Sequence, residues 1–533
     1  MTQAKTLILL MLTISYSYQL KAQLWQSDLE NGTYQNPVLY ADYSDPDIVR
    51  VGDDFYMTAS SFNCVPALPI LHSKDLVNWQ LINYAIKEFE DPAFDTPQHG
   101  NGVWAPAIRY HKEEFYIYYG DPDRGIFVVK TKDPQGDWEK PVLVKKAYGN
   151  IDPCPLWDDD GKVYMVQAFA HSRAGVNSIL QVNKLSADGK RLRDKGKIVF
   201  DGQANHPTIE GPKFYKRNGY YYIFAPGGGV RTGWQTILRS KNIYGPYEDK
   251  IVLHQGNTNI NGPHQGALVE LENGESWFVH FQDKGAYGRI VHLQPVEWVN
   301  DWPMMGKDIN SDGIGEPVTI YKKPNVGKNY PATILRTSDE FNTDKFGLQW
   351  QWHANMKTGW WKFDKNQGSL NLFSVGSNDK NMYLDKIPNL LLQKFIAPKF
   401  TATTRMTFKP ETIDETAGLT IMGLQYSYIA LCKTNKGISL KQYTGSFNGD
   451  EREIIKIEEQ PYNEETIYLR VTVDENVVCN FSFSKDGKNF IPFGKPFKAS
   501  RGKWIGAKTG IFNINPSDRI TEGYATFDWF RVE

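Results

Sequence analysis

Residues 44–58 read SDPDIVRVGDDFYMT. The second half of this stretch, a Gly/Asp turn followed by a short aromatic strand, recurs four more times within the first 320 residues. From one marker aromatic residue to the next, the steps are 60, 48, 58 and 56 residues. The markers are Tyr56, Tyr116, Tyr164, Tyr222 and Phe278. Five copies, each long enough for three or four short strands and separated by Gly, Pro, Asn and Asp clusters, predict a five-bladed β-propeller.

A second periodicity lies upstream of each marker. Five residues stand 11, 12, 12, 12 and 14 positions before their markers, and they are Asp45, Trp104, Asp152, Glu210 and His264. Because the first strand of each propeller blade lines the central channel, we expect these side chains to converge on one axis. Differing polar residues at equivalent places favour a functional site over a structural repeat. Turn formation by Asp-Pro pairs is the alternative, and it explains one pair better than three acids in register.

Two carboxyl groups on opposite sides of a pocket are the smallest set of side chains that hydrolysis of a glycosidic bond requires. One carboxylic acid protonates the leaving oxygen, and a carboxylate opposite activates water or attacks the carbon. A third acid helps to keep the donor protonated, because a charged neighbour makes its ionisation costly. Three acids without accompanying metal-ligand histidines disfavour a transition-metal hydrolase. Calcium stays open, because it binds carboxylate oxygens.

The composition is that of a globular protein with a large core. The 533 residues correspond to two or three domains, and 60 Lys and Arg oppose 61 Asp and Glu. This balance gives no support to binding of nucleic acid or of an anionic membrane. Aromatic residues are numerous, with 15 Trp, 29 Tyr and 28 Phe. Most are expected to pack in strand cores, and some are candidates for stacking on sugar rings.

The first 22 residues resemble a secretory signal peptide. Lys5 supplies a positive charge, residues 7–14 form a short apolar run, and Ala22 precedes the expected cleavage point. The run is too short to span a bilayer, and no cysteine for a lipid anchor lies near the cleavage point. We therefore expect a soluble protein that a bacterium exports to its periplasm or secretes. The four cysteines lack zinc-site spacing, and free thiols and disulfides both stay open.

The motifs together resemble glycoside hydrolase family 43. The resemblance runs in order through about residues 33–320 and rests on several short segments. They are Asn36-Pro37-Val38, Asp45-Pro46, Arg50-Val51-Gly52-Asp53, Trp104-Ala105-Pro106, Ile151-Asp152-Pro153, Glu210-Gly211-Pro212, Gly288-Arg289 and Leu293-Gln294-Pro295-Val296. The resemblance implies a five-bladed propeller, cleavage of arabinose- and xylose-containing glycans with inversion at the anomeric carbon, and no required cofactor.

Carried onto this sequence, the resemblance implies roles for the three acids. Asp45 would be the general base that activates water, and Glu210 would be the general acid. Asp152 would tune the proton affinity of Glu210 and orient it. Asp47 is the rival for the base, but the family usually has a small residue at its place, which favours Asp45.

The resemblance also implies contacts to the substrate. Arg289 corresponds to the family's pocket arginine, with a surface strand arginine as the alternative. Trp104 corresponds to an aromatic residue of the pocket wall, and Phe62 is either a second such residue or a core residue. His264 corresponds to an axial histidine that in relatives holds water or calcium, with a core histidine as the alternative. No metal ligand is assigned, and calcium is considered only as a structural ion.

One departure from the family pattern bears on the substrate. Many family β-xylosidases carry Glu-Ala-Pro-His at the acid, whereas this sequence has Glu210-Gly211-Pro212-Lys213. That variant is similar to a branch with exo-α-L-arabinofuranosidases, including enzymes of xyloglucan and other hemicellulose systems. We therefore expect removal of terminal non-reducing α-L-arabinofuranosyl residues from plant cell-wall oligosaccharides or polysaccharides. A β-D-xylosidase, a bifunctional enzyme and a non-catalytic glycan-binding propeller are the alternatives.

A second domain is predicted after the propeller, which spans residues 33–322. Over residues 336–533 the strands alternate without the blade marker, and Phe527-Asp528-Trp529-Phe530 resembles a motif of the concanavalin-like β-sandwich appended to part of the family. This length suffices for two packed sheets. A structural role, or a loop lent to the rim of the site, is favoured over independent glycan binding. Asp339 and Asp528 either share a calcium ion or lie exposed, and we expect a monomer.

Overall fold

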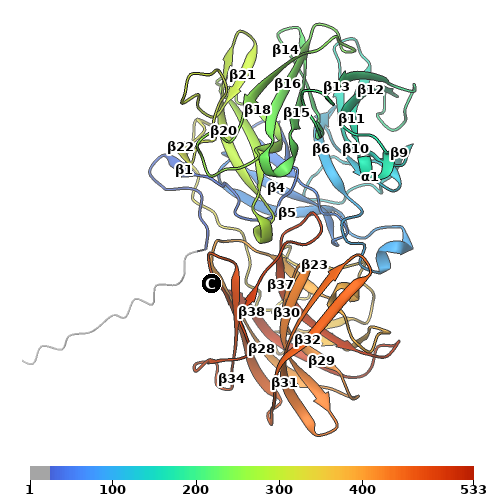
Figure 1. Cartoon of the computed structure of the whole chain (residues 1–533), viewed down its shortest axis with the longest axis vertical. Helices are drawn as coiled ribbons and strands as arrows, with labels where there is room; N and C mark the ends of the chain where they lie inside the picture. Colours follow the sequence, from blue (N-terminus) through green and yellow to red (C-terminus); the bar gives the residue numbers. More distant parts are fainter. Residues whose placement is uncertain (1–23) are drawn as a thin grey trace, which may run out of the picture.

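The computed structural model describes residues 24–533, so the predicted signal peptide lies outside the described residues. Almost every element is a β-strand, and the chain forms a propeller followed by a sandwich (Figure 1). Between residues 24 and 533, no helix is long and apolar enough to cross a membrane. The helical turns are η1 (Pro92–Asp95), α1 (His171–Ala174), α2 (Gly229–Thr232), η2 (Gly285–Tyr287) and η3 (Leu384–Lys386).

The propeller has five blades, each an antiparallel sheet of four strands paired in chain order. Every marker aromatic residue lies on the second strand of its blade, and the five-bladed prediction is confirmed. The blades are β2 (Asp47–Val51), β3 (Asp54–Thr58), β4 (Ala67–Ser73) and β5 (Trp79–Ile86); β6 (Trp104–His111), β7 (Glu114–Asp121), β8 (Gly125–Thr131) and β9 (Val142–Lys146); β10 (Asn150–Trp157), β11 (Val163–Phe169), β12 (Ile179–Leu185) and β13 (Lys197–Asp201); β14 (Lys213–Arg217), β15 (Tyr220–Gly227), β16 (Trp234–Ser240) and β17 (Glu248–Leu253); β18 (His264–Glu270), β19 (Ser276–Asp283), β20 (Arg289–Val299) and β21 (Trp302–Met305).

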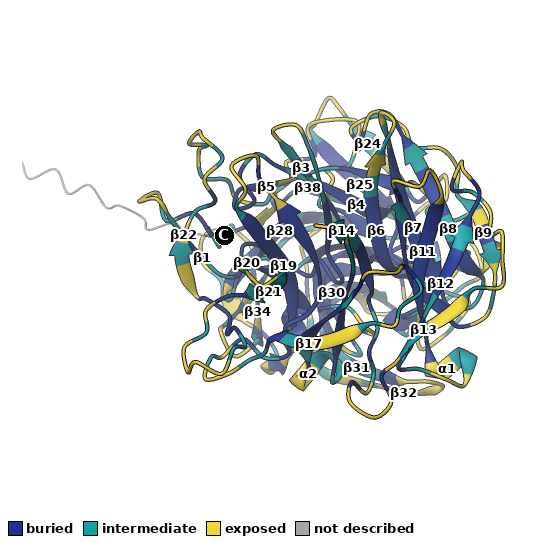
Figure 2. Ribbon diagram, turned by 90° about the horizontal axis from the view of Figure 1, so that it is seen from above, coloured by how far each residue is buried: buried dark blue, intermediate teal, exposed yellow. Residues whose placement is uncertain are grey.

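The blades close into a ring. Strand β2 contacts β6, β6 contacts β10, β10 contacts β14, and β18 returns to β2. At the outside, β1 (Thr33–Gln35) pairs with β22 (Ile320–Lys322), which joins the beginning of the propeller to its end. The inner strands are buried, whereas β13 and the first half of β17 are exposed (Figure 2). The channel between the first strands is therefore where side chains from all five blades meet.

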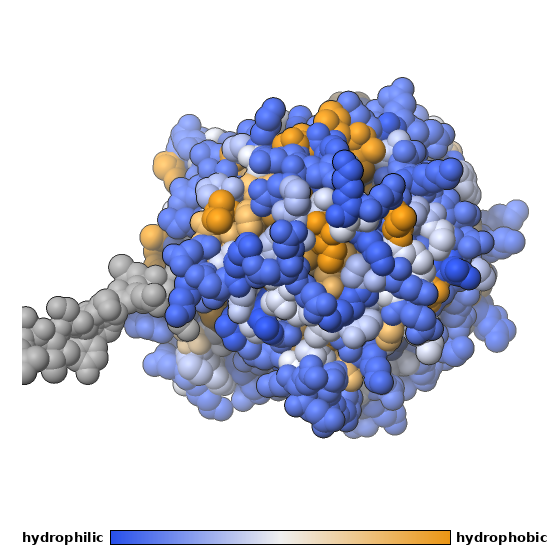
Figure 3. All heavy atoms as spheres, turned by 90° about the horizontal axis from the view of Figure 1, so that it is seen from below, coloured by the Kyte–Doolittle hydropathy of each residue, from blue (hydrophilic) through white to orange (hydrophobic). Residues whose placement is uncertain are grey.

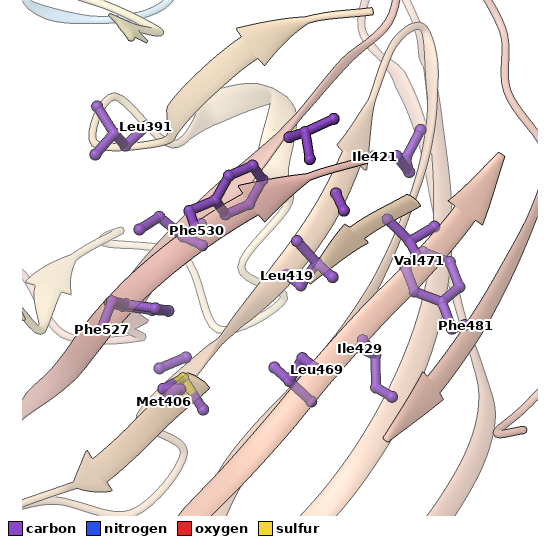
Figure 4. Packing of buried hydrophobic residues seen from close by; sticks show 14 of the residues in the cluster. Leu391, Met406, Leu419, Ile421, Ile429, Leu469, Val471, Phe481, Phe527 and Phe530 are labelled. Carbon is purple, nitrogen blue, oxygen red and sulfur yellow. The ribbon is translucent and has the colours of Figure 1, made fainter. Parts of the chain in front are cut away.

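Two sheets of eight strands pack face to face in the second domain. Their inner faces are apolar, with Leu419, Leu469 and Phe527 among the packed side chains (Figure 4). One sheet has β23 (Gln351–Trp352), β26 (Val375–Gly376), β27 (Leu391–Lys394), β29 (Thr416–Met422), β30 (Gln425–Thr434), β31 (Gly437–Asn448), β32 (Glu451–Pro461) and β37 (Lys508–Asn515). The other has β24 (Trp361–Asp364), β25 (Ser369–Phe373), β28 (Phe400–Lys409), β33 (Thr466–Val473), β34 (Val478–Ser484), β35 (Ile491–Pro492), β36 (Phe497–Lys498) and β38 (Tyr524–Val532).

The two domains share one apolar core. Tyr40, Val65 and Tyr287 of the propeller are buried in the same cluster as Trp352 and Phe395 of the sandwich. Backbone hydrogen bonds also cross the boundary, because Val65 and Trp352 each donate to the carbonyl of the other, at 3.1 and 2.6 Å. The far end of the sandwich is mainly hydrophilic, with small separate apolar groups (Figure 3). The domains are therefore docked through a buried surface rather than joined by a linker alone.

Asp339 is not the exposed acid that the sequence favoured. It is buried, and its carboxylate accepts hydrogen bonds from Trp350 Nε1 at 3.0 Å and from the Phe341 amide at 3.1 Å. Asp528 is paired with Arg405. The expectation of an exposed Asp339 is wrong, because its carboxylate satisfies donors inside the sandwich. All four cysteines are buried and free, which settles the choice between thiols and disulfides.

Candidate active site

A cavity of about 350 Å³ opens where the first strands of the blades begin. Its wall contains six of the seven residues predicted for the site, although they are separated by up to 244 positions in the chain. These six are Asp45, Phe62, Trp104, Asp152, Glu210 and Arg289. The structure therefore brings the three acids, the arginine and two aromatic residues to one place.

The acids reach this cavity through a backbone conformation that all five blades repeat. At the start of each first strand, one residue with a positive φ precedes Pro or Gly. These residues are Asp45 (55°), Ala105 (32°), Asp152 (56°), Gly211 (58°) and Gln265 (33°). The pairing register shifts at this point in three of the blades. Such a bulge redirects a side chain away from the sheet, here toward the channel.

This conformation corrects the alignment expected from the sequence. Asp45 and Asp152 occupy the left-handed position, whereas Trp104, Glu210 and His264 lie one residue before it in their blades. Counting back from the marker aromatic residue misses this shift, because the turn between the first two strands differs in length: Tyr164 pairs with Leu156, eight positions earlier, whereas Tyr222 pairs with Tyr215, seven positions earlier. The five residues are therefore neighbours at the channel without being equivalent.

Asp45 is buried and surrounded by donors. Nη1 of Arg289 lies 3.0 Å from its Oδ1 and 3.3 Å from its Oδ2. The hydroxyls of Ser44 and Ser60 donate to Oδ2 at 2.9 and 2.5 Å. Arg289 also donates to the Ser44 hydroxyl at 2.7 Å, and its guanidinium lies 4.7 Å from the ring centroid of Phe281. These contacts stabilise the negative charge and fix the carboxylate's orientation, as a general base requires.

Asp152 is buried beside Glu210. Its Oδ2 accepts the Gly211 amide at 2.8 Å and the side-chain amide of Gln265 at 3.3 Å. Burial, followed by the charges of Glu210 and Asp45, raises the pKa of Asp152 well above its usual value. Two adjacent carboxyls resist double ionisation, so the pair keeps a proton to higher pH than an isolated carboxyl would. The Glu210 side chain is 34% exposed, so it is the member that can reach a substrate oxygen.

His264 and Asp47 lie outside the cavity wall. His264 is fully buried behind Glu210, with Nε2 3.3 Å from Oε1. It is therefore placed to position the acid, and its predicted contact with substrate is wrong. Asp47 is also fully buried, and it accepts hydrogen bonds from Arg109 Nη1 at 2.6 Å and the Ile108 amide at 2.8 Å. The geometry thus favours Asp45 over Asp47 as the base.

Aromatic side chains form one side of the cavity. The rings of Phe62 and Trp104 lie 6.3 Å apart, and Trp504 follows 6.2 Å from Trp104. Trp504 belongs to the sandwich, just before β37, and it is 39% exposed. Sequence reasoning missed it, because nothing in its neighbourhood repeats or matches a motif. The only sequence-based indication was the expectation that the second domain lends a loop to the rim of the site.

Gln265 is a second residue that sequence reasoning missed. It lies between the acids, and its amide donates to Asp152 in one orientation and to Asp45 in the other. Its position directly after His264 was the available signal. Among residues 24–533, no three His, Cys, Asp or Glu side chains are grouped to hold a metal ion. The oxygens of Asp45 and Asp152 instead face N–H and O–H donors. Calcium as a structural ion stays a prediction.

Comparison with known families divides the chain at the same place as the structure. The model of glycosyl hydrolases family 43 matches residues 34–303. The model of the beta xylosidase C-terminal concanavalin A-like domain matches residues 338–533. The two matches correspond to the propeller and to the sandwich.

Curated relatives align over most of the chain. "Putative beta-xylosidase" from Xylanibacter ruminicola is 41% identical over 91% of this chain and 86% of its own length. "Beta-xylosidase" from Formosa agariphila is 33% identical over 95% of this chain and 91% of its own. A non-reducing end alpha-L-arabinofuranosidase from Bacteroides ovatus is 30% identical over 95% and 96%. With the acids gathered in one cavity and these matches along both domains, the chain belongs to glycoside hydrolase family 43.

Proposed function

We propose that the protein is an exo-acting hydrolase that releases a terminal pentose, chiefly β-D-xylose, from hemicellulose. The observation that carries the proposal is a compact cavity holding Asp45, Asp152 and Glu210 together with Arg289. At about 350 Å³, the cavity is near the lower end of the range for small-ligand sites. This size favours one sugar ring over a polysaccharide chain lying across the site.

The relatives support an order of substrates that differs from the sequence-based expectation. Those at 41% and 33% identity are named as β-xylosidases, whereas the one named as an arabinofuranosidase is 30% identical. We therefore rank xylose first. Removal of α-L-arabinofuranose, including from xyloglucan side chains, is the second candidate. The sequence Glu210-Gly211-Pro212-Lys213 at the acid supports it.

Hydrolysis would proceed by a single displacement. Glu210 donates its proton to the glycosidic oxygen as the bond to the anomeric carbon breaks. Asp45 takes a proton from a water molecule that attacks this carbon from the opposite face. The water oxygen becomes the new hydroxyl group, so the configuration at the anomeric carbon inverts. Proton exchange with solvent then returns Glu210 to its acid form and Asp45 to its carboxylate.

The neighbours of the acid and the base support this division of labour. Asp152 holds the Glu210 segment in place, because its carboxylate accepts the Gly211 amide at 2.8 Å. His264 holds the Glu210 carboxyl from behind. Arg289 keeps Asp45 oriented and neutralises its charge. Trp104 offers an apolar ring to the sugar, and the buried Phe62 packs against it with ring centroids 6.3 Å apart.

The test is hydrolysis of aryl β-D-xyloside and aryl α-L-arabinofuranoside, measured side by side and followed by NMR of the released anomer. Glu210→Gln should lose about 10²–10⁴-fold in kcat on xylobiose, because the donor of the proton is gone. The loss on an aryl xyloside should be smaller, since an aryl leaving group needs little protonation. Glu415→Gln is the matched control, because Glu415 is a buried glutamate of the sandwich with no place in the cavity.

Each outcome of this test favours a different function for the protein. Faster release of xylose with initial formation of the α-anomer supports the proposal. Preference for the arabinoside would promote the second candidate. Retention of configuration would contradict the single displacement, and release from neither substrate would favour a non-catalytic glycan-binding propeller.

We also propose that the protein is exported and that catalysis needs no metal ion. The first 22 residues support export, and labelled fusion or cell fractionation tests it. Dialysis against EDTA should leave kcat unchanged. A fall in the melting temperature that calcium restores would reveal a structural ion instead.

A further inference from the structure

Asp42 is a buried aspartate whose carboxylate is shared between the two domains. Its Oδ1 accepts the backbone amide of Arg289 at 2.8 Å, within the propeller. Its Oδ2 accepts the backbone amide of Gly506 at 2.9 Å, from the sandwich. The side chain is 3% exposed, so both hydrogen bonds are shielded from water. Sequence motifs did not single out this residue.

The backbones on either side of this carboxylate are in close contact. A Cβ atom added to Gly506 would lie 2.8 Å from the Gly288 nitrogen and from the Tyr287 carbonyl carbon. One added to Gly288 would lie 2.5 Å from the Asp42 Cγ atom. The Ala507 amide also donates to the Ala286 carbonyl at 2.7 Å. The sandwich chain is therefore seated directly on the propeller chain beside Asp42.

A buried lysine adds to the same junction. Lys394, on β27 of the sandwich, donates from Nζ to the Asp42 carbonyl oxygen at 2.6 Å. Burial lowers the pKa of Lys394 to about 8, while the Asp42 charge opposes this shift. Lys508 and the Cys64 thiol also face Lys394. The junction thus combines one carboxylate with groups from both domains.

Both backbone segments that Asp42 holds carry side chains of the cavity. Arg289 reaches Asp45, the candidate base, at 3.0 Å. Trp504 stands two residues before Gly506 and forms the aromatic wall with Trp104. The Arg289 guanidinium lies 5.8 Å from the Trp504 ring centroid, so the two side chains meet at the cavity.

We propose that Asp42 is a positioning residue that clamps the Trp504 segment of the sandwich to the Arg289 segment of the propeller. The cavity is then complete only while the domains stay docked. This inference rests on the proposed hydrolytic function but not on which pentose is released. It assigns Asp42 no contact with substrate.

The first test replaces Asp42 by Asn in the full chain. An amide keeps one oxygen acceptor but turns an NH₂ group toward the other backbone amide, so one of the two hydrogen bonds is lost. We expect kcat/KM on aryl glycosides to fall about tenfold, mostly through KM, because an unpaired buried amide displaces the Trp504 segment. Asp339→Asn is the matched control, since Asp339 also accepts a backbone amide but lies inside the sandwich. The control should keep wild-type kcat/KM.

A double-mutant cycle distinguishes the clamp from a general loss of stability. In a Trp504→Ala background, Asp42→Asn should lower kcat/KM by less than about twofold, because the aromatic wall is already gone. Trypsin cleavage after Arg501 or Lys503 should also become faster in Asp42→Asn. An undiminished effect in the Trp504→Ala background, or unchanged cleavage in Asp42→Asn, would overturn the proposal.

Gly506→Ala provides a second route to the same answer if Asp42→Asn does not fold. It pushes the segment away from Gly288 and leaves the Asp42 carboxylate intact. It should reproduce both the loss of kcat/KM and the faster trypsin cleavage, and wild-type behaviour in both would contradict the clamp. If the wild-type chain hydrolyses neither aryl glycoside, the proposed function fails, and the trypsin comparison still decides the clamp.

Discussion

Trp504 of the sandwich and Trp104 of the propeller meet edge to face at the cavity, with their ring centroids 6.2 Å apart and their planes at 69°. The two residues are 400 positions apart in sequence and belong to different domains. Trp104 is held by a hydrogen bond from its Nε1 to the Gly100 carbonyl at 2.8 Å. The sandwich therefore contributes part of the cavity wall, in agreement with the rim role favoured by the sequence.

Trp504→Ala should raise KM for aryl glycosides with little change in kcat. The lost ring contributes binding area at the rim and does not touch the acids, so we expect about a tenfold effect, equivalent to ~1.4 kcal/mol. Initial-rate kinetics measures it. Trp529→Ala is the control, because Trp529 also stacks on an arginine, Arg531, but in the sandwich away from the cavity. An equal rise in KM for both variants would contradict the rim contact.

Arg289→Lys should lower kcat/KM by about 100-fold, the cost typical of losing one precisely placed donor at a reacting site. A lysine retains the charge but lacks the planar guanidinium that places Nη1 against Asp45 and Ser44 and lies over the Phe281 ring. Arg239→Lys is the comparison, since Arg239 is also ion-paired and stacked on aromatic rings, on the outside of the fourth blade. If Arg289→Lys keeps wild-type kcat/KM, the orienting role is wrong.

Asp152→Asn should stabilise the protein at neutral pH while lowering kcat. The raised pKa of Asp152 means that the folded state binds this proton more tightly than the unfolded chain does. The resulting stability is complete below the ordinary value of 3.8 and is lost as the pH rises through the raised folded value. Each pKa unit corresponds to about 1.4 kcal/mol in the free energy of unfolding.

Melting temperatures between pH 3.5 and 8 measure this difference. The gain of Asp152→Asn over wild type should grow with pH and vanish at the acid end. Asp159→Asn, at an exposed position on the same blade, should show no such trend. A gain that does not depend on pH would show that Asp152 does not keep its proton in the folded state.

The isolated propeller, residues 24–335, should be inactive and prone to aggregation. Removing the sandwich exposes Tyr40, Val65 and Tyr287, which are buried in the shared core, and it also removes Trp504. Size-exclusion chromatography and the aryl glycoside assay test this expectation. A soluble, active propeller would show that the sandwich is dispensable for the cavity.

The propeller could be predicted from the sequence because its signal is local and repeated. Each marker, such as Tyr56 or Tyr164, sits on a second strand at a recurring spacing. The shift of Glu210 relative to Asp152 could not be predicted in this way. It depends on which residue takes the left-handed conformation, and the longer turn before the second strand of the third blade changes the count by one.

The acids of the site could be predicted from the sequence more readily than the residues that hold or surround them. The acids Asp45, Asp152 and Glu210 belong to short motifs, and the structure brings them together. Asp42 and Trp504 act across a domain boundary, and contacts between distant segments leave no pattern in either segment alone. The burial of His264 was also hidden, because a polar residue on a first strand reads the same whether it faces the cavity or lies behind another side chain.

The residue with a positive φ that recurs in every blade also identifies a position, Ala105, where a substitution would alter the cavity wall. Of its five occurrences, two carry acids, while Ala105 presents only a methyl group to the cavity wall. Gly211 has no spare room, since a Cβ there would lie 2.2 Å from the Gln265 side chain. A larger side chain at position 105 would extend from the cavity wall, on a backbone that already carries a Cβ atom at a positive φ. Among the five repeated positions, the one in the second blade thus carries a small side chain that lines the cavity.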